Sequence, residues 1–122
     1  MDLYFSAGWC GPCRQFTPKL KRFYEQLTKE GKPFEIIFIS ADREEEDAQE
    51  YYEEKMGNWL MMEYNLSNTE ELRKSLEIQT IPSFKIVKLD GTVVIDDART
   101  QVAEEGSDDA VALFSKWEKL TA

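Results

Sequence analysis

The chain has 122 residues, of which 42% are hydrophobic and 12% aromatic, and its formal net charge is -9. This length and composition indicate one folded domain over residues 1–122 and argue against a disordered chain. The acidic balance argues against nucleic acid or an anionic membrane as a partner, because both require clustered Lys and Arg. Two cysteines and no histidine exclude hydrolases with a histidine base, and they are too few ligands for a structural zinc site.

The N-terminal part of the sequence predicts a strand, a turn that carries both cysteines, and a helix. Residues 3–6 form a short apolar run that is typical of a buried strand. Pro12 suits the first turn of a helix, where its missing N–H is no loss. Beyond Cys13, apolar residues recur on one helical face as far as about Lys29, and Gly31 follows as a stop signal. They are Phe16, Leu20, Phe23, Tyr24 and Leu27.

The middle of the sequence predicts a central strand followed by two helices. Residues 34–39 are almost all apolar, as expected for a strand that is buried on both faces of a parallel sheet. Residues 42–56 predict a helix that begins in an acidic run, which we interpret as a solvated helix start and not as a metal or partner site. Residues 57–65 are expected to be a loop, and Ser67 with Glu70 forms a capping box for a short helix.

The C-terminal part of the sequence predicts a hairpin and a last helix. Residues 83–89 and 92–95 are expected to be its two strands, because the Asp-Gly pair at 90–91 is a tight-turn signal. Residues 96–106 are polar and predict a loop, after which Ser107 caps a helix with one apolar stripe. The element order predicts an α/β fold with a central mixed β-sheet of about four strands, flanked by helices on both faces.

The two cysteines stand three positions apart at the predicted start of the first helix. Free backbone N–H groups and the helix dipole stabilise a thiolate there, so Cys10 is expected to be the catalytic nucleophile. Cys13 lies one turn further in and is expected to be the resolving thiol, which releases the substrate by attacking Cys10. Both could instead be ordinary buried thiols, but Trp9 before them and Gly11-Pro12 between them favour a redox pair.

Two other features of the sequence also concern the candidate site. Pro82 is by itself a proline at the first position of a strand, where proline is tolerated. Trp59, together with Met61, Met62 and Tyr64, either fills the core or contacts a substrate, since aromatic side chains in loops are often functional.

The motifs around the cysteines resemble the thioredoxin superfamily. They are Trp-Cys-Gly-Pro-Cys at residues 9–13, Pro18, Ile81-Pro82 before a strand, and the Asp-Gly hairpin. The resemblance is closer to the tryparedoxin and nucleoredoxin branch in residues 3–10, 16–20, 34–43 and 59–60.

This resemblance implies a thioredoxin fold, a cis Ile81–Pro82 bond that faces the cysteines, and dithiol–disulfide exchange with Cys10 as the nucleophile. We expect no cofactor and no metal. Six residues are expected to line the substrate-binding groove: Trp9, Gly11, Pro12, Trp59, Ile81 and Pro82.

The sequence departs from these families at two places. The cysteines enclose Gly11-Pro12, as in thioredoxins, where tryparedoxin-like motifs have Pro-Pro. Thioredoxins also carry a buried aspartate on the first strand, six residues before the nucleophile, where this chain has Tyr4. No carboxylate in the sequence is an obvious replacement, so the way in which Cys13 loses its proton is an open question.

These observations predict an enzyme that reduces protein disulfides. Its expected partners are disulfide-containing proteins, with a peroxidase among the candidates, and an upstream thiol or reductase that supplies electrons. We expect a monomer, no signal peptide, and a cytoplasmic or nuclear location, because no basic region precedes a long apolar stretch at the N-terminus. The alternatives are a redox-sensitive protein-binding module of the nucleoredoxin type with little turnover, and a dimer that bridges an iron–sulfur cluster through Cys10.

Overall fold

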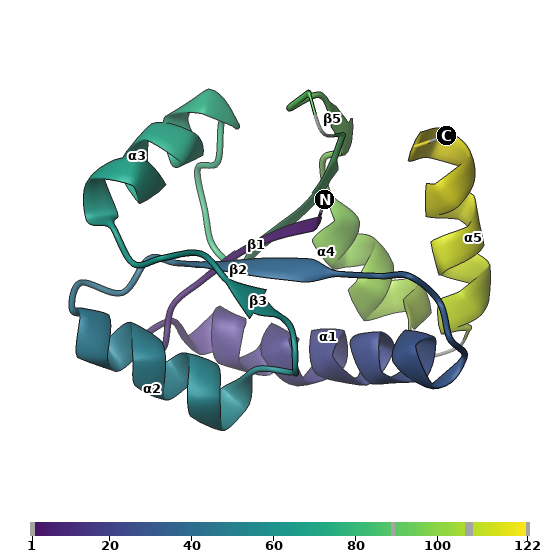
Figure 1. Cartoon of the computed structure of the whole chain (residues 1–122), viewed down its shortest axis with the longest axis horizontal. Coiled ribbons are helices and arrows are strands. Elements are labelled where there is room, and N and C mark those ends of the chain that lie inside the picture. The colour runs from purple at the N-terminus through teal and green to yellow at the C-terminus, as the bar shows by residue number, and fades with distance from the viewer. Residues whose placement is uncertain (1, 89, 107–108, 122) are drawn as a thin grey trace.

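The computed structural model describes residues 2–88, 90–106 and 109–121. Within these ranges one mixed sheet has five strands in the order β3-β2-β1-β4-β5 (Figure 1). The strands are β1 (Asp2–Ser6), β2 (Ile36–Ser40), β3 (Leu60–Met61), β4 (Ser83–Val87) and β5 (Val93–Ile95). β1 is parallel to β2 and antiparallel to β4, so the predicted mixed sheet is confirmed.

The fifth strand, β3, was not predicted, because it lies in the expected loop at residues 57–65. It has only two residues, Leu60 and Met61, and they pair in parallel with Ile37 and Phe38 of β2. So short a segment carries no recognisable hydrophobic pattern, and its strand geometry comes from the neighbouring strand.

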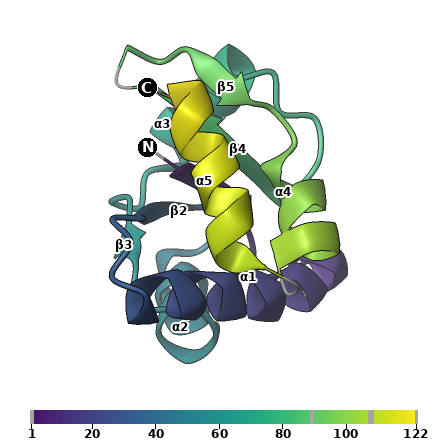
Figure 2. The same ribbon diagram turned by 90° about the vertical axis from the view of Figure 1, so that its right-hand side faces the viewer.

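The helices cover the two faces of the sheet unequally. They are α1 (Gly11–Lys29), α2 (Glu45–Lys55), α3 (Leu66–Ser75), α4 (Ala98–Gln101) and α5 (Ala110–Thr121). Side chains from α1, α2, α4 and α5 join one large core on one face, whereas the smaller core on the other face is covered by α3 (Figures 1 and 2). The expectation of helices on both faces is therefore confirmed.

The large core is built around Tyr4 in the middle of β1. The fully buried Tyr4 ring meets four other aromatic rings at centroid distances of 5.8 to 6.5 Å. Each aromatic pair adds about 0.5–1.5 kcal/mol beyond the burial of its area. These rings belong to Phe16, Phe38, Trp59 and Phe84. The strand that leads into the cysteine turn is thus firmly held.

Two of the local predictions are wrong. The cap of α3 is Asn65, whose side chain accepts a hydrogen bond from the Asn68 N–H at 3.1 Å, and Ser67 already lies inside the helix. The predicted loop at residues 96–106 is helical, with α4 followed by the π-helical turn η1 (Val102–Gly106). This segment lacks an apolar stripe of its own, and its packing on α1 determines its conformation.

That packing is close at Gly106. A Cβ atom there would lie 3.1 Å from Cδ1 of Phe23 on α1 and 3.3 Å from Cγ1 of Val102. At the other end, the Asp97 side chain caps α4 by accepting from the Thr100 N–H at 3.2 Å. Packing against α1 and the Asp97 cap therefore stabilise this helical segment, although its sequence has no apolar stripe.

The ends of the last elements agree with the sequence where the structure describes them. Gly91 has a φ of +91°, as the turn of the predicted hairpin requires. Leu89, predicted in the first strand of the hairpin, and Ser107, predicted to cap the last helix, lie outside the described residues. Asp109 accepts from the Ala112 N–H at 3.0 Å at the start of α5.

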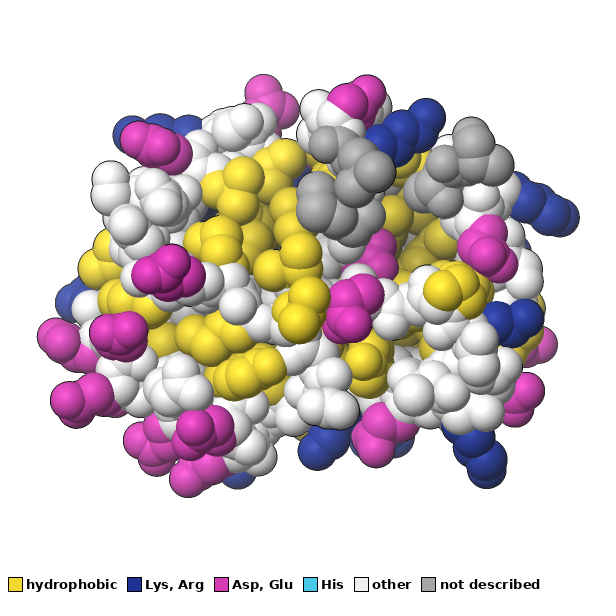
Figure 3. Space-filling view, viewed as in Figure 1, with side chains coloured by type: hydrophobic (Ala, Val, Ile, Leu, Met, Phe, Trp, Pro, Cys, Tyr) yellow, Lys and Arg dark blue, Asp and Glu magenta, His cyan; other side chains and the backbone are white. Residues whose placement is uncertain are grey.

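The surface divides into apolar and acidic regions. Hydrophobic side chains gather between α3 and β5, and acidic side chains lie along α2 at the lower left of Figure 3. The first turn of α2 carries Glu45, Glu46 and Asp47, so part of the net negative charge is concentrated beside the cysteine turn. Among the helices of the described ranges, none is both long and apolar enough to cross a membrane.

Candidate active site

Both cysteines lie at the N-terminus of α1, as predicted. Cys10 is the N-cap residue, and its sulfur accepts a hydrogen bond from the Cys13 N–H at 3.3 Å. Pro12 occupies the first turn, where no intrahelical hydrogen bond is lost. The two cysteines are not joined by a disulfide, so the structure has the pair in its dithiol form.

The surroundings of the two thiols differ. Cys10 is 6% exposed, whereas Cys13 is fully buried. Burial, the largest cause, and the hydrogen bond with Cys10 raise the pKa of Cys13 to about 12, against the opposing effects of Ser6 and the Ala7 backbone. Cys10 is therefore the more accessible of the two thiols.

The turn before Cys10 is held at Gly8. Its N–H donates to Oδ1 of Asp42 at 2.9 Å, and its carbonyl oxygen accepts from Nε of Arg14. A Cβ atom at Gly8 would lie 3.4 Å from both Asp42 Oδ1 and Tyr51 Cβ, so the backbone approaches α2 closely. Sequence reasoning assigned Asp42 to a helix start, but it is a buried carboxylate that fixes the cysteine turn.

The predicted groove residues other than Trp59 lie close to the cysteines in sequence or in space. Trp9, Gly11 and Pro12 are exposed next to Cys10, and the Trp9 side chain is 65% exposed. Ile81 packs on the cysteine pair, and its carbonyl oxygen accepts from the Cys10 thiol at 3.8 Å.

Pro82 follows Ile81, and the bond between them is cis, as the family resemblance implied. The Pro82 carbonyl oxygen accepts from Nη1 of Arg99 at 3.3 Å, which ties this connection to α4. The segment predicted to be a loop thus contributes a side chain that holds the proline beside the thiols.

Trp59 does not belong to the groove. It is 2% exposed and packs edge to face on Tyr4 and Tyr24, at centroid distances of 6.5 and 5.3 Å. A Cβ atom at Gly57 would lie 2.5 Å from Cζ3 of Trp59, so the glycine makes room for the indole ring. Of the two interpretations of Trp59, the structure supports core packing, and the substrate-contact prediction is wrong.

Four hydroxyl groups form a buried hydrogen-bonded row behind Cys13, which we call the hydroxyl network. Tyr4 Oη lies 2.6 Å from Thr17 Oγ1, Thr17 Oγ1 lies 2.7 Å from Tyr51 Oη, and Tyr51 Oη lies 2.8 Å from Ser6 Oγ. Burial raises the pKa of both tyrosines, so both hydroxyls stay protonated at neutral pH. Ser6 ends the row on the side of Cys13, and its side chain lowers the pKa of that thiol.

The sequence contained partial signals for this network, which our sequence reasoning did not use. Tyr4 and Ser6 alternate on a strand and therefore share one face, and Thr17 stands four positions after Cys13 on the same face of a helix. Tyr51 comes from another part of the chain, and only the fold brings it to the other three.

No metal site accompanies the thiols. In the described ranges, no group of three or more Cys, Asp or Glu side chains is arranged to hold a metal ion.

A mixed five-stranded sheet, a cysteine pair at the N-terminus of α1 and a cis-proline beside it define the thioredoxin-fold class of proteins. A family model described as thioredoxin-like matches residues 2–93 of the chain. The chain therefore belongs to the thioredoxin-like family.

Individual relatives carry the names tryparedoxin and nucleoredoxin. The chain is 42% identical over 105 residues to the tryparedoxin of Trypanosoma brucei brucei, covering 84% of this chain and 71% of the relative. It is 39% identical over 106 residues to probable nucleoredoxin 1 of Arabidopsis thaliana, covering 87% of this chain but only 18% of that longer protein.

A solved structure agrees with these relatives. Tryparedoxin II complexed with glutathionylspermidine matches 87% of this chain and 73% of its own, with a TM-score of 0.77 and 37% identity. Together the relatives confirm the predicted tryparedoxin and nucleoredoxin branch and support a thiol oxidoreductase role.

Proposed function

We propose that this chain is a thiol-disulfide oxidoreductase that reduces protein disulfides through Cys10 and Cys13. The observation that carries the proposal is the unequal burial of two free thiols at one helix N-terminus. Cys10 reaches the surface beside the exposed Trp9, and Cys13 is fully buried behind it. At the start of α1 the Cys13 N–H donates a hydrogen bond to the Cys10 sulfur at 3.3 Å.

The reaction proceeds by two disulfide exchanges. The Cys10 thiolate attacks a substrate disulfide, so that a bond forms to one substrate sulfur and the other leaves as a thiolate and takes up a proton. Cys13 then attacks Cys10, which forms the Cys10–Cys13 disulfide and releases the second substrate thiol. The substrate gains two electrons and two protons, and an external dithiol, or two thiols, returns the pair to the dithiol form.

The groups around Cys10 favour a macromolecular substrate. Trp9, Gly11 and Pro12 form an exposed surface, and Ile81 presents a half-buried apolar side chain next to it. Such a surface suits an extended polypeptide that carries a disulfide, and a peroxidase is one such candidate. Because the related tryparedoxin II is complexed with glutathionylspermidine, a small thiol is our candidate for the electron donor.

The test is the reduction of insulin disulfides in the presence of dithiothreitol. The wild-type protein is expected to accelerate the reaction, and Cys10→Ser is expected to abolish the acceleration because the other cysteine, Cys13, is fully buried. A Cys10→Ser variant that reduces insulin at the wild-type rate would refute the assignment of the nucleophile.

A second candidate is a redox-sensitive protein-binding module with little turnover. The 65% exposed side chain of Trp9 favours it, because an aromatic platform beside the thiols can hold a partner without any chemistry. The discriminating experiment captures partners with wild type and with the double variant Cys10→Ser/Cys13→Ser, each with and without reductant. Partner capture that follows the redox state, with no measurable insulin reduction, would favour the binding module.

We also propose that residues 1–122 act as one monomeric domain in the cytoplasm or nucleus. Analytical ultracentrifugation of the dithiol form is expected to give the mass of one chain. A colourless, iron-free preparation is expected as well, whereas visible absorbance would favour a dimer that bridges an iron–sulfur cluster.

A further inference from the structure

The buried position of Cys13 raises a chemical question that depends on the proposed function. To attack Cys10, the Cys13 thiol must lose its proton in a fully buried environment. Asp42 is the buried carboxylate of this region, but its two oxygens accept hydrogen bonds from the Gly8 N–H and the Ser40 hydroxyl. Asp42 is thus engaged in holding the cysteine turn.

The hydroxyl network can donate a hydrogen bond to the Cys13 sulfur without leaving any member unsatisfied. Each hydroxyl has one hydrogen to donate and two lone pairs that accept. If Tyr4 donates to Thr17, Thr17 to Tyr51 and Tyr51 to Ser6, the Ser6 hydrogen is free to point at Cys13. All three oxygen–oxygen distances, 2.6, 2.7 and 2.8 Å, fit this direction as well as the reverse.

The direction of the network therefore responds to the charge on Cys13. A thiolate favours the arrangement in which all four hydrogens point toward the sulfur, because donors in a row polarise one another. Donation to an ionised group is also about twice as strong as donation to a neutral one. Hydroxyl hydrogens turn without any movement of heavy atoms, so this stabilisation requires no rearrangement of the core.

We propose that the hydroxyl network replaces a carboxylate at this site by turning its donors toward Cys13 during the resolving step. Ser6 stands at the Cys13 end of the network and supplies the donor that turns toward the sulfur, and Tyr51, Thr17 and Tyr4 act as positioning residues. The Cys13 proton passes to the sulfur that leaves the substrate. A substrate–Cys10 disulfide and the Cys13 thiol thus become the Cys10–Cys13 disulfide and a substrate thiol.

The resolving step can be observed by itself with dithiobis(nitrobenzoate), whose released thiolate is coloured. The reduced protein releases one thiolate when Cys10 attacks the reagent and a second when Cys13 displaces the other half from Cys10. The pH dependence of the second release reports the ionisation of Cys13 in the mixed disulfide. The titratable groups that face it are Cys10 at the N-cap of α1, Tyr4 on β1 and Tyr51 on α2. Asp42, which follows β2, lies against Gly8 in the same turn.

The decisive variant is Tyr51→Phe, which keeps the ring and interrupts the network. Its second release is expected to shift by about half to one pH unit to higher pH, or about three- to tenfold in rate at fixed pH. Its first release is expected to be unchanged. Thr17→Val and Tyr4→Phe are expected to cause smaller shifts in that order, because they remove donors further from the sulfur.

Tyr52→Phe is the matched control. Tyr52 is the next residue on α2, and its hydroxyl donates to the Trp59 carbonyl oxygen outside the network. This variant is expected to leave both releases at their wild-type pH dependence. Equal shifts in Tyr51→Phe and Tyr52→Phe would overturn the proposal, because a general loosening of α2 would then explain both.

Other outcomes also have a definite meaning. Identical second-release profiles in wild type and Tyr51→Phe would overturn the role of the network while leaving the proposed function intact. If circular dichroism shows that Tyr51→Phe does not fold, Thr17→Val and Tyr4→Phe decide the question by the same criterion. A wild-type protein that releases no second thiolate would refute the proposed exchange reaction itself.

Discussion

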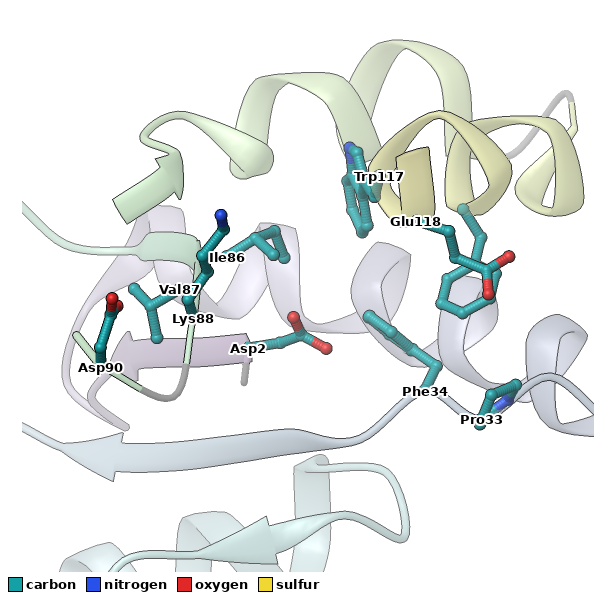
Figure 4. A pocket seen from close by; sticks show the side chains of 10 residues that line it. Asp2, Pro33, Phe34, Ile86, Val87, Lys88, Asp90, Trp117 and Glu118 are labelled. Carbon is teal, nitrogen blue, oxygen red and sulfur yellow. The ribbon is translucent and has the colours of Figure 1, made fainter. Parts of the chain in front are cut away.

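The two ends of β1 hold two titratable groups in different circumstances, a buried thiol and a half-buried carboxyl. Cys13 lies beyond the C-terminal end of the strand, and Asp2 begins the strand in a pocket between β4 and α5 (Figure 4). Burial is the largest cause of a raised pKa at both ends, to about 12 for Cys13 and about 7 for Asp2. The same physical cause, loss of solvent, thus raises the pKa at both ends of the strand.

They differ in what surrounds the buried group. At Cys13 the other causes are hydrogen bonds: the one with Cys10 disfavours the charged form, and those with Ser6 and the Ala7 backbone favour it. At Asp2 they are charges: the N-terminal amino group favours the charged form, and Glu35 disfavours it. The Asp2 pocket is also larger, about 590 Å³ against about 230 Å³ for the hollow beside Trp9. The size of a hollow therefore does not locate the chemistry of this protein. A buried titratable group surrounded by hydrogen-bonding partners is a better indicator of a candidate site than pocket volume is.

The largest effect that would sharpen this comparison is expected from Cys13→Ser. Insulin reduction should slow strongly, because the substrate remains bound to Cys10 in a mixed disulfide that no second thiol of the chain can resolve and that dithiothreitol must cleave from solution. Mass spectrometry of the intact protein should show this adduct, and Cys10→Ser should show none. Insulin reduction by Cys13→Ser at the wild-type rate would place the resolving thiol outside this chain.

The next largest effect concerns Trp9 and Trp59. Trp59→Ala is expected to lower the free energy of unfolding by about 3–5 kcal/mol, because it empties a core site, whereas Trp9→Ala should change it by less than about 0.5 kcal/mol. Urea denaturation measures both. Trp9→Ala should instead slow insulin reduction, because Trp9, unlike Trp59, is exposed beside Cys10.

Trp59→Phe provides the control for this pair. It keeps a ring in the site and removes an indole N–H that has no hydrogen-bond partner among the described residues. Its cost should therefore be clearly below that of Trp59→Ala. A folded Trp59→Ala variant of wild-type stability would contradict the core assignment.

A smaller effect is expected when the pH is raised. The pKa of Cys13 rises from 9.0 to about 12 on folding, so the folded state holds its proton more tightly than the unfolded state. The resulting stability is present below about pH 9 and is lost as the pH rises toward about 12, by at most about 1.4 kcal/mol per pH unit. The difference in unfolding free energy between reduced wild type and Cys13→Ser should shrink accordingly. A constant difference would mean that Cys13 does not titrate in this way.

The smallest effect is expected at the other end of β1. The pKa of Asp2 is raised from 3.8 to about 7, so its contribution to stability is present below about pH 4 and is lost as the pH rises through about 7. Asp2→Asn should thus raise the free energy of unfolding above neutral pH, by less than about 1 kcal/mol because the side chain is partly solvated.

Glu35→Gln is the control for Asp2→Asn, and it should stabilise less and in the same direction because it removes the repulsion alone. Neither variant should alter insulin reduction. A change in insulin reduction caused by Asp2→Asn would show that the two ends of β1 do not act independently.

Much of the fold follows from local sequence patterns. The apolar face from Phe16 to Leu27 predicts α1, and the Asp-Gly pair at residues 90–91 predicts the hairpin. Both features depend on residues close together in the sequence, so propensity and periodicity suffice. The helical segment that contains α4 and η1 could not be predicted in this way, because contact with Phe23 on α1 supplies what its own sequence lacks.

The sequence by itself was enough to predict the proposed reactive pair, because Cys10, Cys13 and the residues between them lie within a single helical turn. It also placed Tyr4 where thioredoxins have an aspartate. Only the tertiary structure decided the rest of the site, because Tyr51 meets Thr17 and Ser6 across 34 and 45 positions of sequence. A local sequence pattern cannot predict hydrogen bonds over such separations. The packing of α1 and α2 against β1 brings these hydroxyls into one row.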